Sequence, residues 1–289
     1  MIGTADSIIE RMRGYNPAID VERLGRAFAF GRDAHVGQMR ASGEPYFTHP
    51  IAVANILIDM RLDEDTVITA LLHDTVEDCG VTLSTLDQQF GGDVPQLVDG
   101  VTKLSRIAIQ SSPSSAQAEN FRKLLLAMSE DVRVLLVKLA DRTHNMRTLS
   151  FIKKPDKQQR IARETMDIFA PLAERIGLTR IQQELEDNAF AVLNGEMRQS
   201  IINRLDFLTS EAEITIPTIA VELQDTLSRI GLECSVSGRM KSAYSIWRKM
   251  QNKAVTMDQL ADIMAFAFWC RVRRIAMLRL ASCTRIIQP

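Results

Sequence analysis

The sequence predicts a mainly α-helical protein: a helical bundle, then a helical connector, then a short α/β segment. Apolar residues recur three and four positions apart through the first 195 residues, which is the spacing of helices with one buried face. A charged stretch begins at residue 196 and keeps a helical composition as far as residue 232. After it come a possible strand, a glycine turn and a basic helix.

The helices of the bundle can be placed in order from their boundaries. They are expected at 21–40, 49–62, 64–78, 81–91, 130–149 and, as a pair, 157–193. Pro50 suits the first turn of the second helix, where a backbone N–H would have no partner. Thr82 or Ser84 caps the fourth helix, and two glycines end it. The Ser-rich stretch at 110–117 is expected to be a surface loop.

Composition limits the classes of function. With 289 residues, 46% of them apolar, the chain can bury a core. A net charge of −1 gives no overall attraction to nucleic acid or to an anionic membrane, so any phosphate binding must be local. The longest apolar run, at 263–270, is too short to span a bilayer, and the four cysteines show no CxxC spacing. We therefore expect a cytoplasmic protein with no membrane association and no clear nucleic-acid site.

Four ionisable side chains are crowded into LLHDTVED at residues 71–78. In a helix, His73 lies over Glu77, and Asp74 lies over both Glu77 and Asp78. Three carboxylates on one face repel one another. A metal, a basic partner or water must therefore hold them together.

A second polar group lies in the later helix that carries KLADRTHN, where Asp141, His144 and Asn145 share a face. If the two helices pack beside the helix start that carries His49, they offer two imidazoles and two carboxylates to one cation. The expected ligands are His49, His73, Asp74 and Asp141. His144 is expected to support this site rather than bind the metal, and His35 is expected to pack or form a hydrogen bond in the first helix.

A site with nitrogen and oxygen ligands and no thiolate suits a divalent first-row metal. Manganese fits well, and iron or zinc remain alternatives. Glu77 and Asp78, one turn further along, would position or deprotonate a water whose pKa the cation has lowered. This pattern indicates a metal-assisted hydrolase.

Several stretches together closely resemble the RelA/SpoT enzymes, which make and destroy the guanosine alarmones (p)ppGpp. In order they are AHVGQMRASGEPYFTHPIAVA, LLHDTVED, VDGVTKLSRI, AENFRK, VKLADRTHNMRTL, PLAERIGL and ELEDNAF. The dense match covers 25–195. The resemblance implies an HD-type phosphohydrolase bundle at 1–195, a helical connector at 196–232, and a truncated synthetase-like segment with an aberrant basic tail at 233–289.

The same resemblance implies a reaction and a set of roles. The family's hydrolase removes the 3′-pyrophosphate from guanosine tetra- or pentaphosphate, leaving GDP or GTP. It implies Mn²⁺ at the four ligands named above and a catalytic acid pair in Glu77 and Asp78. It also implies that the nucleotide is held by Arg40, Ser42 and Asn145. Ala41 stands where many relatives carry lysine, which implies a weaker hold on the substrate.

The stretch SGRMKSAYSIWRKM resembles the opening motif of the family's synthetase. The matching positions, expected to be vestigial, are Arg239, Lys241, Ser245, Lys249 and Asp262. Ala267 stands where relatives carry an arginine, and the later catalytic segments are absent, so we expect synthetase activity to be lost. Two alternatives to a (p)ppGpp hydrolase stay open: a hydrolase of another nucleotide, and a remnant that binds (p)ppGpp without turnover.

Overall fold

The computed structural model describes residues 3–109, 131–260 and 263–270. The chain divides into two units, at residues 1–193 and 194–289. Three expectations fall outside the described residues: the loop at 110–117, Asp262 and the basic tail at 271–289. Among the helices that are described, none is both long and apolar enough to cross a membrane.

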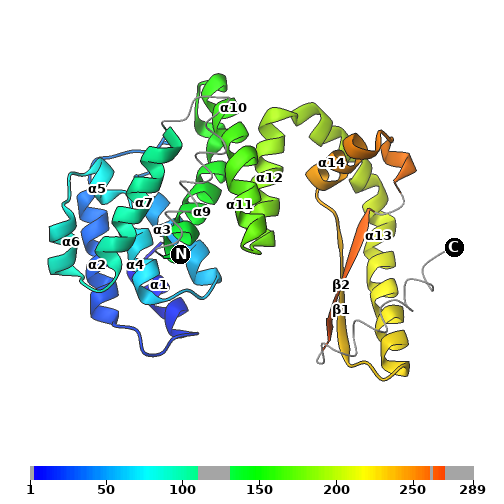
Figure 1. Cartoon of the computed structure of the whole chain (residues 1–289), viewed down its shortest axis with the longest axis horizontal. Coiled ribbons are helices and arrows are strands. Elements are labelled where there is room, and N and C mark those ends of the chain that lie inside the picture. Colours follow the sequence, from blue (N-terminus) through cyan, green and yellow to red (C-terminus); the bar gives the residue numbers. More distant parts are fainter. Residues whose placement is uncertain (1–2, 110–130, 261–262, 271–289) are drawn as a thin grey trace. The chain divides into compact units, whose positions relative to one another are not determined.

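The first unit is built from helices alone within its described residues (Figure 1). They are α1 (Ala5–Arg13), α2 (Val21–Ala34), α3 (Thr48–Asp59), α4 (Glu64–Leu72), α5 (Thr75–Asp78), α6 (Leu83–Gln89), α7 (Val94–Ile109), α9 (Val132–Arg147), α10 (Pro155–Glu164), α11 (Ala170–Arg175) and α12 (Thr179–Leu193). A 3-10 turn, η1 (Leu149–Phe151), follows α9, and a π-helical turn, η2 (Thr165–Phe169), joins α10 to α11.

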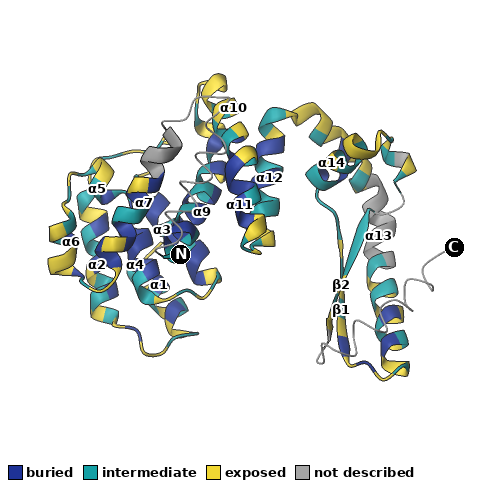
Figure 2. Ribbon diagram, viewed as in Figure 1, coloured by how far each residue is buried: buried dark blue, intermediate teal, exposed yellow. Residues whose placement is uncertain are grey.

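Helix α4 forms the centre of this unit. Its residues from Thr66 to Leu72 are all buried, and it contacts α2, α3, α7 and α9 (Figure 2). Gly31 allows α2 to come this close, because a Cβ there would lie 2.7 Å from the carbonyl oxygen of Leu71 and 2.6 Å from the Phe47 ring. The central position of α4 places the residues at its C-terminal end in the interior.

Several of the described helices begin with a side-chain cap. At each of these N-caps a side-chain oxygen accepts a hydrogen bond from a backbone N–H two or three residues further on. The capping residues are Thr4, Asp20, Asp63, Thr82, Asp131 and Ser242. Of the two caps predicted for the fourth bundle helix, Thr82 is therefore the correct one.

The largest differences from the predicted helices are at 64–78 and 21–40. The predicted helix at 64–78 is interrupted at His73 and Asp74, where the Thr75 hydroxyl donates to the Leu72 carbonyl oxygen at 2.7 Å. The predicted helix at 21–40 ends at Ala34, and Gly37 then adopts a φ of 81°. The residues after Gly37 form a loop that leads to α3.

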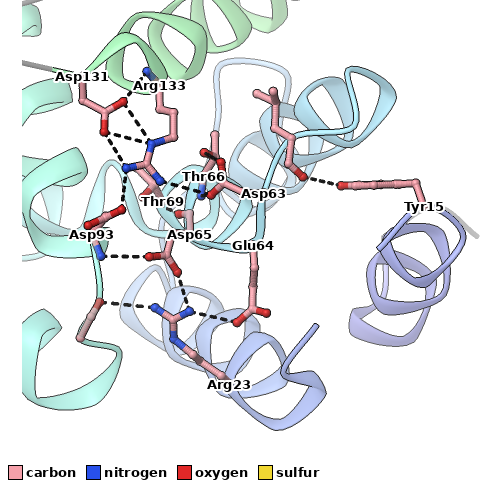
Figure 3. A network of polar contacts seen from close by, with 12 residues as sticks. Tyr15, Arg23, Asp63, Glu64, Asp65, Thr66, Thr69, Asp93, Asp131 and Arg133 are labelled. Carbon is pink, nitrogen blue, oxygen red and sulfur yellow. Dashed lines mark hydrogen bonds and ion pairs between the residues drawn. The ribbon is translucent and has the colours of Figure 1, made fainter. Parts of the chain in front are cut away.

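Two arginines join the starts of four helices, α2, α4, α7 and α9 (Figure 3). Arg133, in the first turn of α9, donates to Asp131 and to Asp93 at 2.6 Å each, and Asp93 lies just before α7. Hydrogen bonding to Arg133 lowers the pKa of Asp131. Arg23 of α2 donates to Asp65 of α4 at 2.5 Å. This network fixes the N-terminal ends of the helices whose other parts carry the site.

The second unit contains α13 (Gly195–Arg229), β1 (Cys234–Met240), α14 (Ala243–Lys253), η3 (Met257–Gln259) and β2 (Met264–Cys270). The strands pair antiparallel from Cys234 opposite Cys270 to Met240 opposite Met264. The predicted glycine turn is wrong, because Gly238 lies inside β1. A Cβ at Gly238 would lie 2.6 Å from the Ile216 and Phe266 side chains, so the close approach of α13 requires glycine there. The mainly α-helical fold class is confirmed for the described residues.

Candidate functional site

Three buried side chains from three helical segments meet in the first unit. His49 is the second residue of α3, His73 directly follows α4, and Asp141 lies in α9. They are 2%, 2% and 5% exposed, and one potential ligand atom from each lies within 4.8 Å of the others. The packing of α3 against both α4 and α9 brings these positions together.

The tautomer of a neutral His73 follows from its contacts. Its Nδ1 lies 2.8 Å from the Ala70 carbonyl oxygen, which can only accept, so Nδ1 carries the hydrogen. The lone pair of Nε2 then points into the cluster, where this buried atom has no hydrogen-bond partner. Asp74 Oδ1 lies 3.2 Å from Nε2, but two lone pairs facing each other repel unless a cation lies between them. A bare, buried imidazole nitrogen is the arrangement that a metal ligand requires.

His49 has a similar environment. Its Nε2 lies 3.2 Å from Asp141 Oδ1 and 3.7 Å from Asp74 Oδ2, and its Nδ1 lies 2.7 Å from His144 Nδ1. Burial lowers the pKa of His49, and burial together with His49 lowers the pKa of His144 to about 3. Both imidazoles are therefore neutral near pH 7, and one shared hydrogen links them. His144 thus contacts His49 directly.

Asp141 is held as a carboxylate despite its burial. Burial opposes its ionisation, but the charge of Lys138 and the hydrogen bond with His49 hold the pKa of Asp141 well below its usual range. Lys138 Nζ lies 2.5 Å from Oδ2, and Asn145 Nδ2 donates to Oδ1 at 2.5 Å. This cluster therefore offers one carboxylate and two imidazole rings as potential metal ligands.

Tyr46 answers the question of what holds the crowded carboxylates. Its hydroxyl lies 2.8 Å from Asp74 Oδ2 and 3.1 Å from Asp78 Oδ2. Asp78 and Glu77 are exposed on the single turn of α5, so they are accessible to solvent. Sequence reasoning missed Tyr46, although it lies in the same GEPYFTHP stretch as His49.

A cavity of about 430 Å³ adjoins Asp141. Arg40, Ser42 and Asn145, the expected substrate-binding residues, all line it, as does Ala41. Arg40 Nη2 donates to Asn145 Oδ1 and to the Thr148 hydroxyl, both at 3.1 Å. Four other cationic residues line the cavity, Lys138, Arg142, Lys157 and Arg160, and the sequence singled out neither of the last two. The KKPDKQQR run was the available signal for the last two.

An HD-domain family model matches residues 27–179 of this chain. The GTP pyrophosphokinase rsh of Brucella melitensis is 46% identical over 259 residues, which cover 90% of this chain and 34% of that protein. The bifunctional (p)ppGpp synthase/hydrolase SpoT of Escherichia coli is 45% identical over 261 residues, which cover 90% of this chain and 37% of that protein. This chain is an HD-domain protein of the RelA/SpoT family.

The chain spans about a third of the length of these RelA/SpoT relatives. A solved structure titled "A metazoan ortholog of SpoT hydrolyzes ppGpp and plays a role in starvation responses" also matches, with a TM-score of 0.48 and 22% identity. The match covers 60% of this chain and 96% of that one. The HD domain is a fold of divalent-metal phosphohydrolases, in agreement with the ligands brought together here.

The positions that match the RelA/SpoT synthetase motif lie in the second unit. Arg239 is on β1, Lys241 follows β1 and donates its backbone N–H to the Ile263 carbonyl oxygen at 2.9 Å, and Ser245 and Lys249 lie on α14. The Ser242 and Ser245 hydroxyls are 2.9 Å apart. Asp262 lies outside the described residues, so only four of the five positions have a described place.

Proposed function

We propose that this chain is a Mn²⁺-dependent (p)ppGpp 3′-pyrophosphohydrolase. It would convert guanosine tetra- or pentaphosphate and water into GDP or GTP and pyrophosphate. The observation that carries the proposal is the bare, buried Nε2 of His73 beside His49 and Asp141, next to a cavity lined with cations. The activity in the printed names of the relatives supports the choice of substrate.

The residues fit a divalent metal. Two ligand atoms that each lie about 2.1 Å from one ion, at a right angle to each other, are about 3 Å apart. The 3.2 Å from His49 Nε2 to Asp141 Oδ1 and from His73 Nε2 to Asp74 Oδ1 agree with that spacing. We assign His49, His73, Asp74 and Asp141 as the ligands, and their nitrogen and oxygen donors are compatible with Mn²⁺.

The other residues of the chain would then serve one displacement at phosphorus. A metal held by His49, His73, Asp74 and Asp141 would stabilise charge on the phosphoryl oxygens and lower the pKa of water. Asp78, with Glu77 beside it, accepts a proton from the water that attacks the phosphorus attached to the 3′-oxygen. The bond from that phosphorus to the 3′-oxygen breaks, and the 3′-oxygen takes up a proton, so that GDP and pyrophosphate leave.

The cavity suits a nucleotide with several phosphates. A volume of about 430 Å³ lies in the usual range for small-molecule sites. Arg40, Lys157 and Arg160 can pair with phosphate charge, and Ile152 and Ile161 offer apolar surface to the base or ribose. We therefore assign Arg40, Ser42 and Asn145 to nucleotide binding, as the sequence suggested, and add Lys157 and Arg160.

For the second unit we propose that this chain does not transfer pyrophosphate from ATP to GDP. The described strand β2 has the sequence MAFAFWC and carries no charged side chain that could pair with phosphate. Ala267, opposite Ser237, is the position where relatives have an arginine. Incubation with ATP and GDP is expected to yield no ppGpp.

The test of the hydrolase is to identify its products. Purified protein is incubated with ppGpp and Mn²⁺, with and without a chelator, and the nucleotides are separated by ion-exchange chromatography. Equal amounts of GDP and pyrophosphate, abolished by the chelator, support the proposal. Release of single phosphates would contradict it. Turnover of another nucleotide but not ppGpp would favour a different HD phosphohydrolase, and ppGpp binding without turnover would favour the non-catalytic remnant.

A further inference from the structure

The Tyr46 hydroxyl lies between two carboxylates of the site, and the reaction outlined above gives it no task. One of these, Asp74, is an assigned metal ligand, and the other, Asp78, is an assigned proton acceptor. The hydroxyl oxygen lies 2.8 Å from the first and 3.1 Å from the second. A hydroxyl has one hydrogen, so it donates to one carboxylate at a time while staying within reach of both.

We propose that Tyr46 is a positioning residue that fixes Asp74 toward the metal ligands and holds Asp78 beside it. This inference rests on the proposed hydrolase function. Asp74 uses its two oxygens differently: Oδ2 accepts from Tyr46, while Oδ1 faces the bare Nε2 of His73 at 3.2 Å. Metal-binding carboxylates are usually oriented by such a hydrogen bond to their second oxygen.

Tyr46 also reduces the repulsion between the two acids. A tyrosine hydroxyl ordinarily keeps its proton up to about pH 10. It can therefore act as a donor throughout the pH range in which the carboxylates are charged. A hydrogen bond from a neutral donor to a carboxylate is stronger than one between two neutral groups.

The position of the hydroxyl is set by contacts to the ring and backbone of Tyr46. The His35 ring stacks on the Tyr46 ring, with centroids 4.8 Å apart and an interplanar angle of 24°. The Tyr46 backbone N–H donates to the Gln38 carbonyl oxygen at 2.9 Å, and Gln38 Nε2 donates to the backbone oxygen of Asp78 at 3.3 Å. Removing the hydroxyl alone should therefore leave the ring in place.

The same ring also lies near the substrate cavity, which gives the inference a competing explanation. The Arg40 guanidinium is 5.8 Å from the Tyr46 ring centroid, and both residues line the cavity. If Tyr46 acted through Arg40 on nucleotide binding, its loss would raise KM. If it acts through Asp74 and Asp78, its loss lowers the affinity for Mn²⁺ and kcat.

The test compares Tyr46→Phe with Tyr15→Phe in the full chain. Tyr15 is a matched control, because its hydroxyl donates at 2.8 Å to the Leu62 carbonyl oxygen, away from the cluster. Titration calorimetry gives the Mn²⁺ dissociation constant without substrate, and ppGpp hydrolysis gives kcat and KM. We expect Tyr46→Phe to bind Mn²⁺ about tenfold more weakly and to lose at least about tenfold in kcat, with KM nearly unchanged. Tyr15→Phe should match the wild type in all three.

The outcomes separate the inference from the function on which it rests. Wild-type Mn²⁺ affinity and kcat in Tyr46→Phe would overturn the inference, and so would a change confined to KM. A wild-type chain that does not hydrolyse ppGpp would refute the proposed function alone, because the Mn²⁺ affinities still decide the part of Tyr46 at Asp74. Thermal melting of Tyr46→Phe should stay close to that of Tyr15→Phe, and a large fall in Tm would overturn the positioning role in favour of a structural one.

Discussion

Replacing Gly31 by alanine should weaken both the fold and the metal site. A Cβ at Gly31 would lie 2.7 Å from the Leu71 carbonyl oxygen and 2.6 Å from Phe47 Cε2, so α2 must move away from α4. Leu71 and Phe47 each lie two positions before a histidine that we assign to the metal, His73 and His49 respectively. The displacement therefore reaches the ligands through the backbone.

The size of the effect follows from two opposing contributions. Overpacking a core costs about 1–3 kcal/mol, and a clash with a rigid backbone carbonyl belongs at the upper end. Replacing glycine by alanine inside a helix gains about 1 kcal/mol. The net loss at Gly31 is therefore about 2 kcal/mol, or about 4–8 °C in Tm for a unit of this size.

Gly25 provides the matched control, since it lies in the same helix and a Cβ there would have no other atom within 4 Å. Gly25→Ala should raise Tm by about 2–4 °C, because it gains helix propensity without a clash. Calorimetric melting and a Mn²⁺ titration of both variants provide the assay. If Gly31→Ala is as stable as Gly25→Ala and binds Mn²⁺ equally well, the inference that α2 needs glycine at position 31 to pack against α4 is wrong.

Three further predictions concern the metal, the acidic limit and the cavity. At about 100 times its dissociation constant, Mn²⁺ should stabilise the first unit by about 2.7 kcal/mol, and His73→Ala should abolish this shift in a melting experiment. Because the pKa of His144 falls from 6.5 to about 3 on folding, the unfolded chain binds more protons than the folded chain at a pH below 6.5. The free energy of unfolding should therefore decline as the pH falls from 6.5 toward 3, and it should decline less steeply in His144→Gln. The midpoints of urea unfolding at each pH measure this. The same pH dependence in the wild type and in His144→Gln would contradict a neutral His144. Lys157→Ala should raise KM for ppGpp several-fold with little change in kcat. Lys154 lies outside the cavity, so Lys154→Ala should leave both constants unchanged. The same change of KM in the two variants would exclude a phosphate contact at Lys157.

The sequence predicted those parts of the structure that depend on local spacing. Helix starts follow from a side-chain cap and its nearby N–H, so the sequence narrowed the cap of α6 to Thr82 or Ser84, and the structure has Thr82. Asp141 and Asn145 lie four residues apart, so their contact follows from helix geometry alone. The close approach of His49, His73 and Asp141 was predictable because each follows or precedes an apolar helix segment that has to pack.

The parts that the sequence did not reveal depend on contacts between distant segments. Tyr46 reaches Asp74 across 28 positions, and nothing in the local pattern around either residue indicates that contact. Nothing in the sequence singles out Lys157, and only its place on the cavity wall separates it from other surface lysines. Gly238 looked like a turn, because a strand glycine and a turn glycine differ only in what packs against them.

The most direct test of the central claim measures the initial rate of GDP formation from ppGpp as a function of Mn²⁺ concentration, for the wild type and for His73→Gln. We expect saturable, chelator-sensitive activity in the wild type. His73→Gln should fold but lose nearly all activity, because the glutamine amide cannot replace the bare imidazole nitrogen. Equal rates in the two proteins, or wild-type turnover that persists in the chelator, would contradict a metal centre built on His73.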